Sequence, residues 1–468
     1  MIPTTIITLV DGVRIVVPDS LEMITPYVLR EQQDWFEDEI KFLRRLLQPG
    51  FNVIDIGANY GVYTLSMAQT VGPSGRVWAF EPASTTASLL AEGIAANGFE
   101  QVLLERAALS SARGTAQLTL NQNSELNAIV RDNLSTDGCE TVPVITLDDC
   151  LESFGWRNIE FIKIDAEGEE ANILKGGKRF FAELSPLVQY EVKAGAVLHL
   201  DLVQAFSSLG YESYRLVPGL DLLIPFDPEA QPDGYLLNLF CCKPDRVSQL
   251  VTQGFLLNAA ALKTGMERFK ARASHDAYNW RNTLTRLPYG TELADVWERT
   301  LAVDKSGRVE EALSLYVASQ DASLPAAERY HALARSFMRF SFLCEQEPSY
   351  LRLASLARVA QDYGARSVAV SALEQQCKII LEHNQLDPSE PFLSPCARFD
   401  FVPPGEALGD WVLSALLEGF ERLGSFSSFY TGESARQRLN IIRELGFGSA
   451  EMERRLLLLQ QRFDLPRE

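Results

Sequence analysis

Hydrophobic residues in the first half of the chain fall in short continuous runs, and these alternate with segments of helical spacing. The runs predict strands at 53–56, 77–80, 102–106, 159–164, 187–192, 211–217 and 235–241. The spacing between them predicts helices at 62–70, 85–97, 171–175 and 199–209. This alternation is typical of a mostly parallel sheet with helices on both faces. The short polar connection 219–233 indicates that the last two strands form an antiparallel pair at the sheet edge.

The segments around this pattern predict further elements. Alternation over residues 5–17 around Asp11-Gly12 predicts a β-hairpin. Helical spacing over 29–47, stopped by Pro49-Gly50, predicts an amphipathic helix that leads into the first core strand. Residues 115–120 and 141–145 predict an inserted strand pair, joined by the polar loop 121–138. Loops of that length are often functional.

The pattern changes after Pro244. Between residues 247 and 465 period-2 runs almost vanish, and helical spacing dominates, most clearly at 351–363 and 368–382. Paired helices of this kind resemble tetratricopeptide hairpins, although no clean 34-residue repeat is present. The sequence therefore predicts an α/β domain at 1–245 and an all-α domain at 246–468. Helical arrays commonly bind proteins, so a homo-oligomer or a protein contact is one expected role for the second domain.

Composition narrows the functional classes. The chain has 468 residues and a net charge of −19, a balance that argues against binding bare nucleic acid. Seven cysteines without a C-x-x-C pair and only four histidines argue against a zinc cluster and favour reduced thiols in a cytoplasmic protein. The sequence shows no secretory signal and no run of 18 apolar residues, so no membrane span is expected.

The first candidate site is the turn after the first core strand, which reads D-x-G-x-N-x-G from Asp55 to Gly61. Glycines let the backbone approach a nucleotide-like ligand at the carboxyl end of the sheet, and Asp55 can fix the loop or meet a methionine amino group. A dinucleotide fingerprint would need Gly where Asn59 stands. Glu81, at the end of the next strand, can accept both hydroxyls of a ribose. The predicted cofactor is S-adenosylmethionine, held by Asp55, Gly57, Ala58, Asn59, Gly61, Glu81, Pro82, Arg106 and Ala107. The alternatives are a plain tight turn for the loop and simple tight packing for the strand end 105–108.

The second candidate site is the acidic turn that ends the strand 159–164. Asp165 directly follows an apolar strand, where a carboxylate can deprotonate a hydroxyl or, with Glu167, hold a divalent cation such as Mg²⁺. For Glu169 and Glu170 a solvated helix N-terminus is the preferred interpretation. Glu191 lies in a buried strand and can join Asp165 at the reacting hydroxyl or at a metal. Its alternative is an ion pair with Lys163 or Lys193.

These motifs, taken in order, resemble the FkbM family of S-adenosylmethionine-dependent methyltransferases. The resemblance covers about residues 26–244, and Ala166 and Glu169 stand where the family usually has Val and Ala. It rests on the segments 53–65, 79–82, 107–110, 144–149, 161–170 and 174–177, and on Glu191. It implies a class I methyltransferase fold, Rossmann-like, with a seven-stranded mostly parallel sheet whose last strand is antiparallel. It also implies O-methylation, commonly of a sugar or a glycan-linked hydroxyl.

Three hypotheses follow. The leading one is an O-methyltransferase with a saccharide acceptor and Asp165 as its base. The second, a nicotinamide-dependent enzyme, shares the ribose contact of Glu81 but needs the missing glycine at position 59. The third is a non-catalytic or bifunctional scaffold whose helical domain binds a protein partner. The complete set of Asp55, Glu81 and Asp165 argues against loss of the pocket.

Overall fold

The computed structural model of the protein describes residues 3–130, 138–194, 197–272, 279–303, 308–383 and 387–464. The chain divides into two compact units. The α/β unit comprises residues 1–216, 223–232 and 236–256, and the helical unit comprises 217–222, 233–235 and 257–468. The second unit therefore includes two short segments that belong, in sequence, to the last strand connections of the first.

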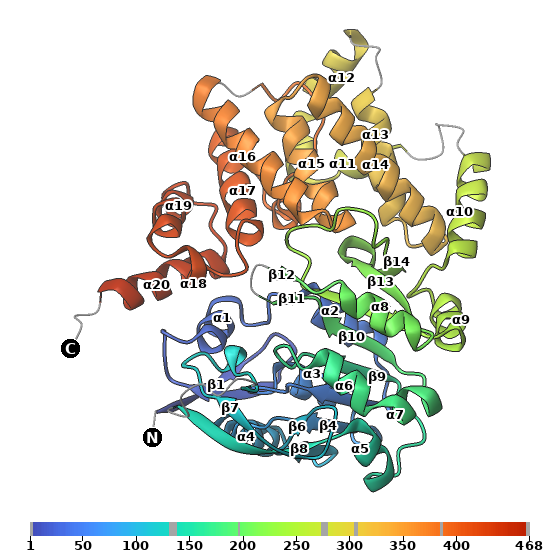
Figure 1. Ribbon diagram of the computed structural model, residues 1–468. Helices are drawn as coiled ribbons and strands as arrows, with labels where there is room; N and C mark the ends of the chain where they lie inside the picture. Colours follow the sequence, from blue (N-terminus) through green and yellow to red (C-terminus); the bar gives the residue numbers. More distant parts are fainter. Residues whose placement is uncertain are drawn as a thin grey trace. The chain divides into compact units, whose positions relative to one another are not determined.

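An eight-stranded sheet forms the centre of the α/β unit (Figure 1). Its order is β14-β13-β15-β10-β9-β3-β4-β5, with parallel pairing from β10 to β5 and antiparallel pairing of β15 with both β10 and β13. The sheet is therefore mostly parallel with an antiparallel last strand, β15, which is the arrangement that the family resemblance implied. The strands are β3 (Asn52–Ile56), β4 (Arg76–Phe80), β5 (Val102–Glu105), β9 (Phe161–Ile164), β10 (Leu187–Glu191), β13 (Glu212–Val217), β14 (Leu222–Pro225) and β15 (Asn238–Cys242).

The seven strands expected from the sequence are present, and β14 is an eighth at the edge. It lies inside the segment 219–233, which was expected to be a polar connection. The reason is local: Leu222, Leu223 and Ile224 are buried, and a short apolar run next to an exposed sheet edge gains hydrogen bonds by pairing.

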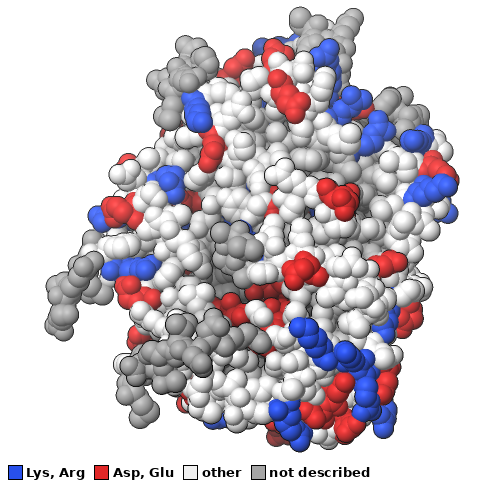
Figure 2. All heavy atoms as spheres, viewed as in Figure 1, with Lys and Arg blue, Asp and Glu red and all other residues white. Residues whose placement is uncertain are grey.

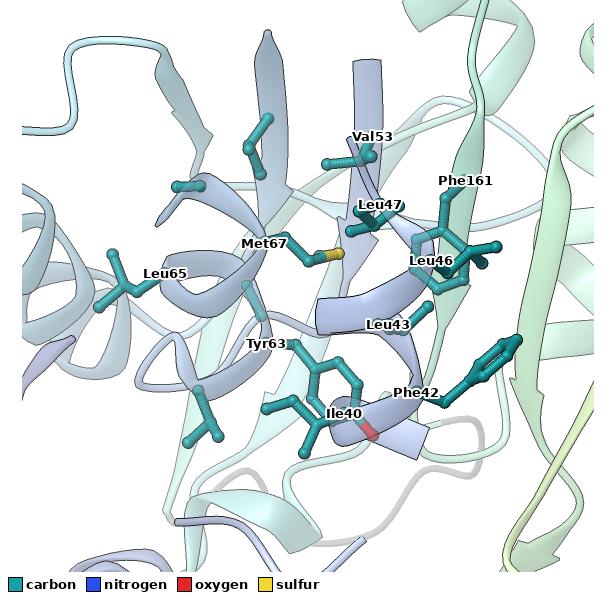
Figure 3. Close-up of a cluster of buried hydrophobic side chains, with 14 of the residues drawn as sticks. Ile40, Phe42, Leu43, Leu46, Leu47, Val53, Tyr63, Leu65, Met67 and Phe161 are labelled. Atoms are coloured by element: carbon teal, nitrogen blue, oxygen red, sulfur yellow. The ribbon is translucent and has the colours of Figure 1, made fainter. Parts of the chain in front are cut away.

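The central strands are apolar on both faces, because helices cover each side. Alternate residues point to opposite faces, so Val53 and Phe161 pack against α2 (Asp38–Leu46) and α3 (Val62–Val71), while Ile54 and Ile162 pack against the helices of the other layer. Figure 3 shows the first layer, in which Leu43 of α2 and Met67 of α3 belong to the same buried cluster as Val53. The helices of this unit after α2 are α3 (Val62–Val71), α4 (Ser84–Asn97), α5 (Leu147–Ser153), α6 (Glu170–Gly176), α7 (Lys178–Glu183), α8 (Asp201–Ser208) and α9 (Pro244–Gln253).

The N-terminal segment confirms the hairpin, β1 (Thr4–Thr8) with β2 (Arg14–Pro18), but not the single helix at 29–47. Two helices replace it, α1 (Ile24–Gln32) and α2 (Asp38–Leu46). Gln33 is left-handed at φ 57° and ends α1. The residues that follow are held by side chains, since Arg44 of α2 donates to both carboxylate oxygens of Asp34 at 2.7 Å. The break matters because it carries Glu37 into the site described below.

The inserted strand pair is confirmed as β7 (Gly114–Thr119) with β8 (Cys139–Ile145), and β8 also pairs with the short strand β6 (Ala108–Leu109). After β7 the chain makes a 3₁₀ turn, η1 (Ser124–Leu126). Part of the predicted loop 121–138 lies outside the described residues. Beyond β10, the two-residue strands β11 (Lys193–Ala194) and β12 (Val197–Leu198) pair with each other.

The helical unit consists of helices packed against one another. Neighbours α13, α14, α15 and α16 pack in sequence order, and Gly364 ends α15 at φ 85°. Among the described residues, no helix is long and apolar enough to cross a membrane. The helices of the helical unit are α10 (Ala259–Arg272), α11 (Arg281–Leu284), α12 (Pro288–Val303), α13 (Arg308–Gln320), α14 (Ala326–Gln346), α15 (Tyr350–Tyr363), α16 (Arg366–His383), α17 (Leu408–Leu423), α18 (Ser428–Thr431), α19 (Glu433–Glu444) and α20 (Ala450–Asp464). The unit also contains the 3₁₀ turns η2 (Pro218–Leu220) and η3 (Ala397–Phe401).

Candidate active site

The turn between β3 and α3 lies very close to Asp165, the residue that follows the neighbouring strand β9. Gly57 has φ +80°, and a Cβ there would overlap the carbonyl oxygen of Asp165 and lie 2.9 Å from its carbonyl carbon. Asn59 is also left-handed, at φ 49°, a conformation that asparagine tolerates better than most residues. Gly61, at φ +92°, precedes the first residue of α3, and a Cβ there would meet Leu90. The loop can therefore take this shape only with glycine at its two ends.

Glu81, at the end of β4, anchors this loop. Its two carboxylate oxygens accept hydrogen bonds from the backbone N–H groups of Asn59 and Ala83, each at 2.9 Å. Burial raises the pKa of Glu81 to about 7. Each oxygen of a carboxylate has two lone pairs, so each retains one acceptor position for a ligand.

Asp55, on β3, has a buried oxygen without a partner. The side chain is 1% exposed. Its Oδ2 accepts a hydrogen bond from Thr64 Oγ1 at 2.5 Å, while Oδ1 has no hydrogen-bond partner among the described residues. Burial raises the pKa of Asp55, and the nearby charge of Lys163 opposes that rise. An unpartnered buried acceptor is rare and costly, which indicates a ligand that supplies a hydrogen-bond donor.

The acidic turn after β9 is shaped by its own side chains. Glu167 and Gly168 are left-handed, and Glu170 Oε1 accepts hydrogen bonds from the backbone N–H groups of Ala166 at 2.9 Å and Gly168 at 3.3 Å. Glu169 accepts a hydrogen bond from Ser110 Oγ at 2.7 Å. Glu169 and Glu170 thus hold the turn together. They are buried, however, and not solvated as the sequence suggested.

Asp165 is held by a buried lysine. Lys163 Nζ donates to Asp165 Oδ2 at 2.6 Å, and only 5% of the lysine side chain is exposed. The ammonium also lies 4.7 Å from the centre of the Tyr63 ring. Asp165 therefore has one fixed oxygen. Lys163 pairs with this residue and not with Glu191.

Glu191 lies close to both carboxylates of the turn. Oxygen atoms of Asp165, Glu167 and Glu191 lie within 4.8 Å of one another, so these groups could hold a metal ion. Burial, followed by repulsion from Asp165, raises the pKa of Glu191 to about 10 and that of Glu167 to about 8. At neutral pH both groups are mainly protonated, and they can donate a hydrogen bond as well as accept one.

One pocket contains most of the residues predicted from the sequence. Its volume, including the part open to solvent, is about 1020 Å³. The described lining residues do not include Gly61, Arg106 or Glu191, and Arg106, directly after β5, is exposed. The predicted residues that line the pocket are Asp55, Gly57, Ala58, Asn59, Glu81, Pro82, Ala107, Asp165 and Glu167.

Sequence reasoning missed one wall of this pocket, which comes from the break between α1 and α2. Glu37 Oε2 accepts hydrogen bonds from Tyr63 Oη at 2.5 Å and Asn238 Nδ2 at 3.2 Å, and Oε1 accepts one from Trp35 Nε1 at 3.0 Å. Burial raises the pKa of Glu37, and Lys163 opposes the rise. Trp35, Glu37 and Tyr63 all line the pocket. An acidic residue within an amphipathic pattern gave no signal for this role.

The segment around η1 borders the same pocket. Ser124 Oγ donates to Asn59 Oδ1 at 2.9 Å. Asn123 Oδ1 and Glu125 Oε1 accept hydrogen bonds from the first two backbone N–H groups of α1, at 2.9 and 3.1 Å. The inserted sheet therefore caps a helix that precedes it by about a hundred residues and connects that helix to the cofactor loop.

Comparison with known proteins gives a consistent result. Residues 55–213 match the sequence profile described as the methyltransferase FkbM domain. The chain is 29% identical over 154 residues to methyltransferase sdnD of Sordaria araneosa, an alignment that covers 26% of this chain and 59% of that protein. The chain thus spans about three fifths of that relative's length.

Solved structures show weaker similarity. A methyltransferase FkbM from Methylobacillus flagellatus is 17% identical, with 42% of this chain and 44% of that chain covered and a TM-score of 0.29. An S-adenosylmethionine-dependent O-methyltransferase from Thermotoga maritima is 15% identical, with 52% and 78% covered and a TM-score of 0.25.

Proposed function

We propose, from the premise that residues 55–213 are a methyltransferase FkbM domain, that the chain transfers a methyl group from S-adenosylmethionine to a hydroxyl of a sugar or glycoconjugate. The observation that carries the proposal is the unpartnered oxygen of Asp55 in a glycine-turn pocket at the carboxyl end of the sheet. Ligands of open α/β sheets bind at that edge.

The residues present fit the cofactor. Asp55 Oδ1 offers a buried acceptor to the ammonium of the methionine part, and Glu81 keeps one lone pair on each oxygen for the two ribose hydroxyls. Pro82 and Ala107 leave space for a flat ring beside them. When bound, the cofactor supplies a methyl group on a positively charged sulfur. Arg106, being exposed, has no part in this proposal.

We assign the deprotonation of the acceptor hydroxyl to Asp165. An attacking hydroxyl must lose its proton as its oxygen bonds to carbon, and a positioned carboxylate can take that proton. Lys163 fixes Oδ2, so Oδ1 is the atom that faces this task. Glu191, mainly protonated at neutral pH, is suited to orienting the acceptor through a hydrogen bond and not to acting as a second base. Most of the acceleration then comes from positioning.

A divalent cation such as Mg²⁺ is not required in this proposal. Asp165, Glu167 and Glu191 present the oxygen ligands that hard cations prefer. Lys163 already supplies a positive charge to Asp165 at 2.6 Å, so we expect turnover to persist after dialysis against EDTA. Loss of turnover on dialysis, with recovery on adding Mg²⁺, would assign the three carboxylates to a metal.

We assign methyl transfer to residues 1–245 and a protein-binding or self-association role to residues 246–468. The helical unit also includes residues 233–235, which belong to the range 1–245 in sequence. Asp233 accepts hydrogen bonds from the backbone N–H and the hydroxyl of Ser367, each at 2.9 Å, and the Arg366 guanidinium lies 4.7 Å from the Tyr235 ring. Removing 246–468 would leave residues 233–235 without these partners. Sedimentation of the full chain, with and without candidate proteins, is therefore a better test than truncation.

The direct test is turnover. The full chain is incubated with S-adenosylmethionine and a panel of saccharides and glycoconjugates, and methylated products are identified by mass spectrometry. Asp165→Asn should abolish product, while Asp201→Asn, at a side chain that is 77% exposed, should not. Full activity of Asp165→Asn would overturn the assignment of the base.

A further inference from the structure

Trp35 and Glu37, in the break between α1 and α2, form one wall of the pocket. Both side chains are partly exposed, so a ligand in the pocket can reach them. They lie outside the matched methyltransferase domain, which begins at residue 55. They are also separate from the cofactor contacts proposed for Asp55 and Glu81 and from the proposed base, Asp165. We call Trp35 and Glu37 the N-terminal wall.

Three donors fix the carboxylate of Glu37. Its Oε2 accepts hydrogen bonds from Tyr63 Oη of α3 at 2.5 Å and from Asn238 Nδ2 of β15 at 3.2 Å. These two bonds use both lone pairs of Oε2. Oε1 accepts one hydrogen bond, from Trp35 Nε1 at 3.0 Å, and so keeps one lone pair. The pocket therefore contains an acceptor that is already in position before a ligand binds, and preorganisation of this kind lowers the cost of binding.

The order of the strands places the N-terminal wall away from the ribose contact. β4, which is followed by Glu81, lies on one side of β3, whereas β9, β10 and β15 follow in that order on the other side. Glu37 is bonded to this other side through Asn238 of β15. Asp165 follows β9 and so lies between the two. A cofactor held by Asp55 and Glu81 and an acceptor held by the wall would thus reach the proposed base from opposite sides.

A second buried acceptor without a partner lies beside this wall. Gln189 Nε2 donates to Tyr63 Oη at 3.3 Å, while Gln189 Oε1 is fully buried and has no hydrogen-bond partner among the described residues. Gln189 of β10 is the register partner of Lys163 of β9, so both side chains point to the same face of the sheet, and Lys163 lines the pocket. Because such acceptors are rare, Gln189 indicates, separately from Asp55, that a hydrogen-bond donor enters on the β10 side.

We propose that Trp35 and Glu37 bind the acceptor, and that the acceptor is an uncharged polyhydroxylated ring such as a neutral sugar. The ring packs its C–H face on the Trp35 indole, and one hydroxyl donates to Glu37 Oε1. This inference rests on the proposed function and names the residues that select its substrate. An aromatic face beside a fixed carboxylate suits a molecule with apolar ring carbons and hydroxyl donors at its rim. An apolar acceptor would leave the carboxylate without a donor, and an anionic one would be repelled.

The test measures binding of the methyl glycosides of glucose, galactose, mannose and rhamnose by saturation-transfer NMR titration. The full chain is first saturated with S-adenosylhomocysteine. The probes carry no charge, because the chain has a net charge of −19 and acidic side chains gather near the middle of the face drawn in Figure 2. For the glycoside that binds most tightly, deoxy analogues that each lack one hydroxyl are compared. One of them should bind the wild type at least about tenfold more weakly, because it lacks a hydrogen bond to a charged group.

The variant Glu37→Gln identifies the partner of that hydroxyl. It should bind the parent glycoside at least about tenfold more weakly than the wild type does, with no further loss for the deoxy analogue that lacks the hydroxyl. If Glu37 only fastened the N-terminal segment to α3 and β15, the variant would weaken all analogues equally. Trp35→Ala should weaken every glycoside about fivefold or more. Glu92→Gln, at an exposed residue of α4, is the matched control and should change nothing.

The possible failures are distinguishable. Binding of none of the four glycosides, an equal loss for all analogues in Glu37→Gln, or loss of S-adenosylhomocysteine binding in that variant would overturn the assignment of the N-terminal wall. Failure of the wild type to bind S-adenosylhomocysteine would instead reject the proposed function.

Discussion

Gly57→Ala should abolish cofactor binding without unfolding the protein. The structure gives two separate costs for this change. The first is conformational, because φ is +80° and an L side chain in that region costs roughly 1–2 kcal/mol. The second is steric, because the new Cβ would overlap the carbonyl oxygen of Asp165, a backbone atom that no rotamer change can move.

The size of the steric cost follows from the distances. The Cβ would lie 2.9 Å from the Asp165 carbonyl carbon, whereas unstrained carbon atoms stay about 3.5–4.0 Å apart. The turn or the end of β9 must therefore shift by more than about half an ångström, at a cost typical of overpacking, about 1–3 kcal/mol. Together the two costs give a loss of about 2–5 kcal/mol in the free energy of unfolding.

The same shift displaces the loop that Glu81 holds and the proposed base Asp165, so we expect S-adenosylhomocysteine affinity to fall at least about a hundredfold. Urea unfolding and calorimetry measure the two effects. Gly12→Ala is the matched control: its φ is +85° and a Cβ there has nothing within 4 Å, so it should cost about 1 kcal/mol and leave binding intact. Wild-type affinity in Gly57→Ala would refute the reasoning.

The remaining predictions concern single carboxyl groups. Asp165→Asn should keep S-adenosylhomocysteine affinity within about threefold while turnover disappears; a parallel loss of affinity in calorimetry would contradict this. Wild-type affinity should weaken as pH falls through about 7, because protonating Glu81 removes an acceptor for the ribose, and in Glu81→Gln that pH dependence should vanish. Glu418→Ala should destabilise the helical unit in urea by about 3–5 kcal/mol, since the fully buried carboxylate binds Arg398 and Arg422. Glu433→Ala, at a side chain that is 63% exposed, should change stability little.

The sheet was predictable because its strands are buried on both faces. Such strands are nearly continuous apolar runs, for example 161–164, because both of their faces are buried. This pattern can be read from the sequence without knowing which distant residues the strands contact. The cofactor turn was predictable for a similar reason, since glycine at 57 and 61 has a local cause in positive φ. The prediction could not say that Gly57 also makes room for Asp165, because that contact joins residues far apart in the sequence.

Failures arose where side-chain bonds override periodicity. Residues 29–47 keep helical spacing, yet the ion pair of Arg44 with Asp34 and the left-handed Gln33 divide them into two helices. Glu37 enters the pocket only because of that break, so no pattern within the helix could reveal it. Arg106, predicted from its place at a strand end, is exposed and is not among the described pocket-lining residues, so its contact with a ligand stays a prediction.

The measurement that tests the central claim most directly is calorimetric titration of the full chain with S-adenosylhomocysteine, beside Asp55→Ala. The account predicts binding in about the micromolar range for the wild type and its loss in the variant, because Asp55 supplies the buried acceptor for the ligand's ammonium. Absence of binding to the wild type, or equal binding by Asp55→Ala, would contradict it.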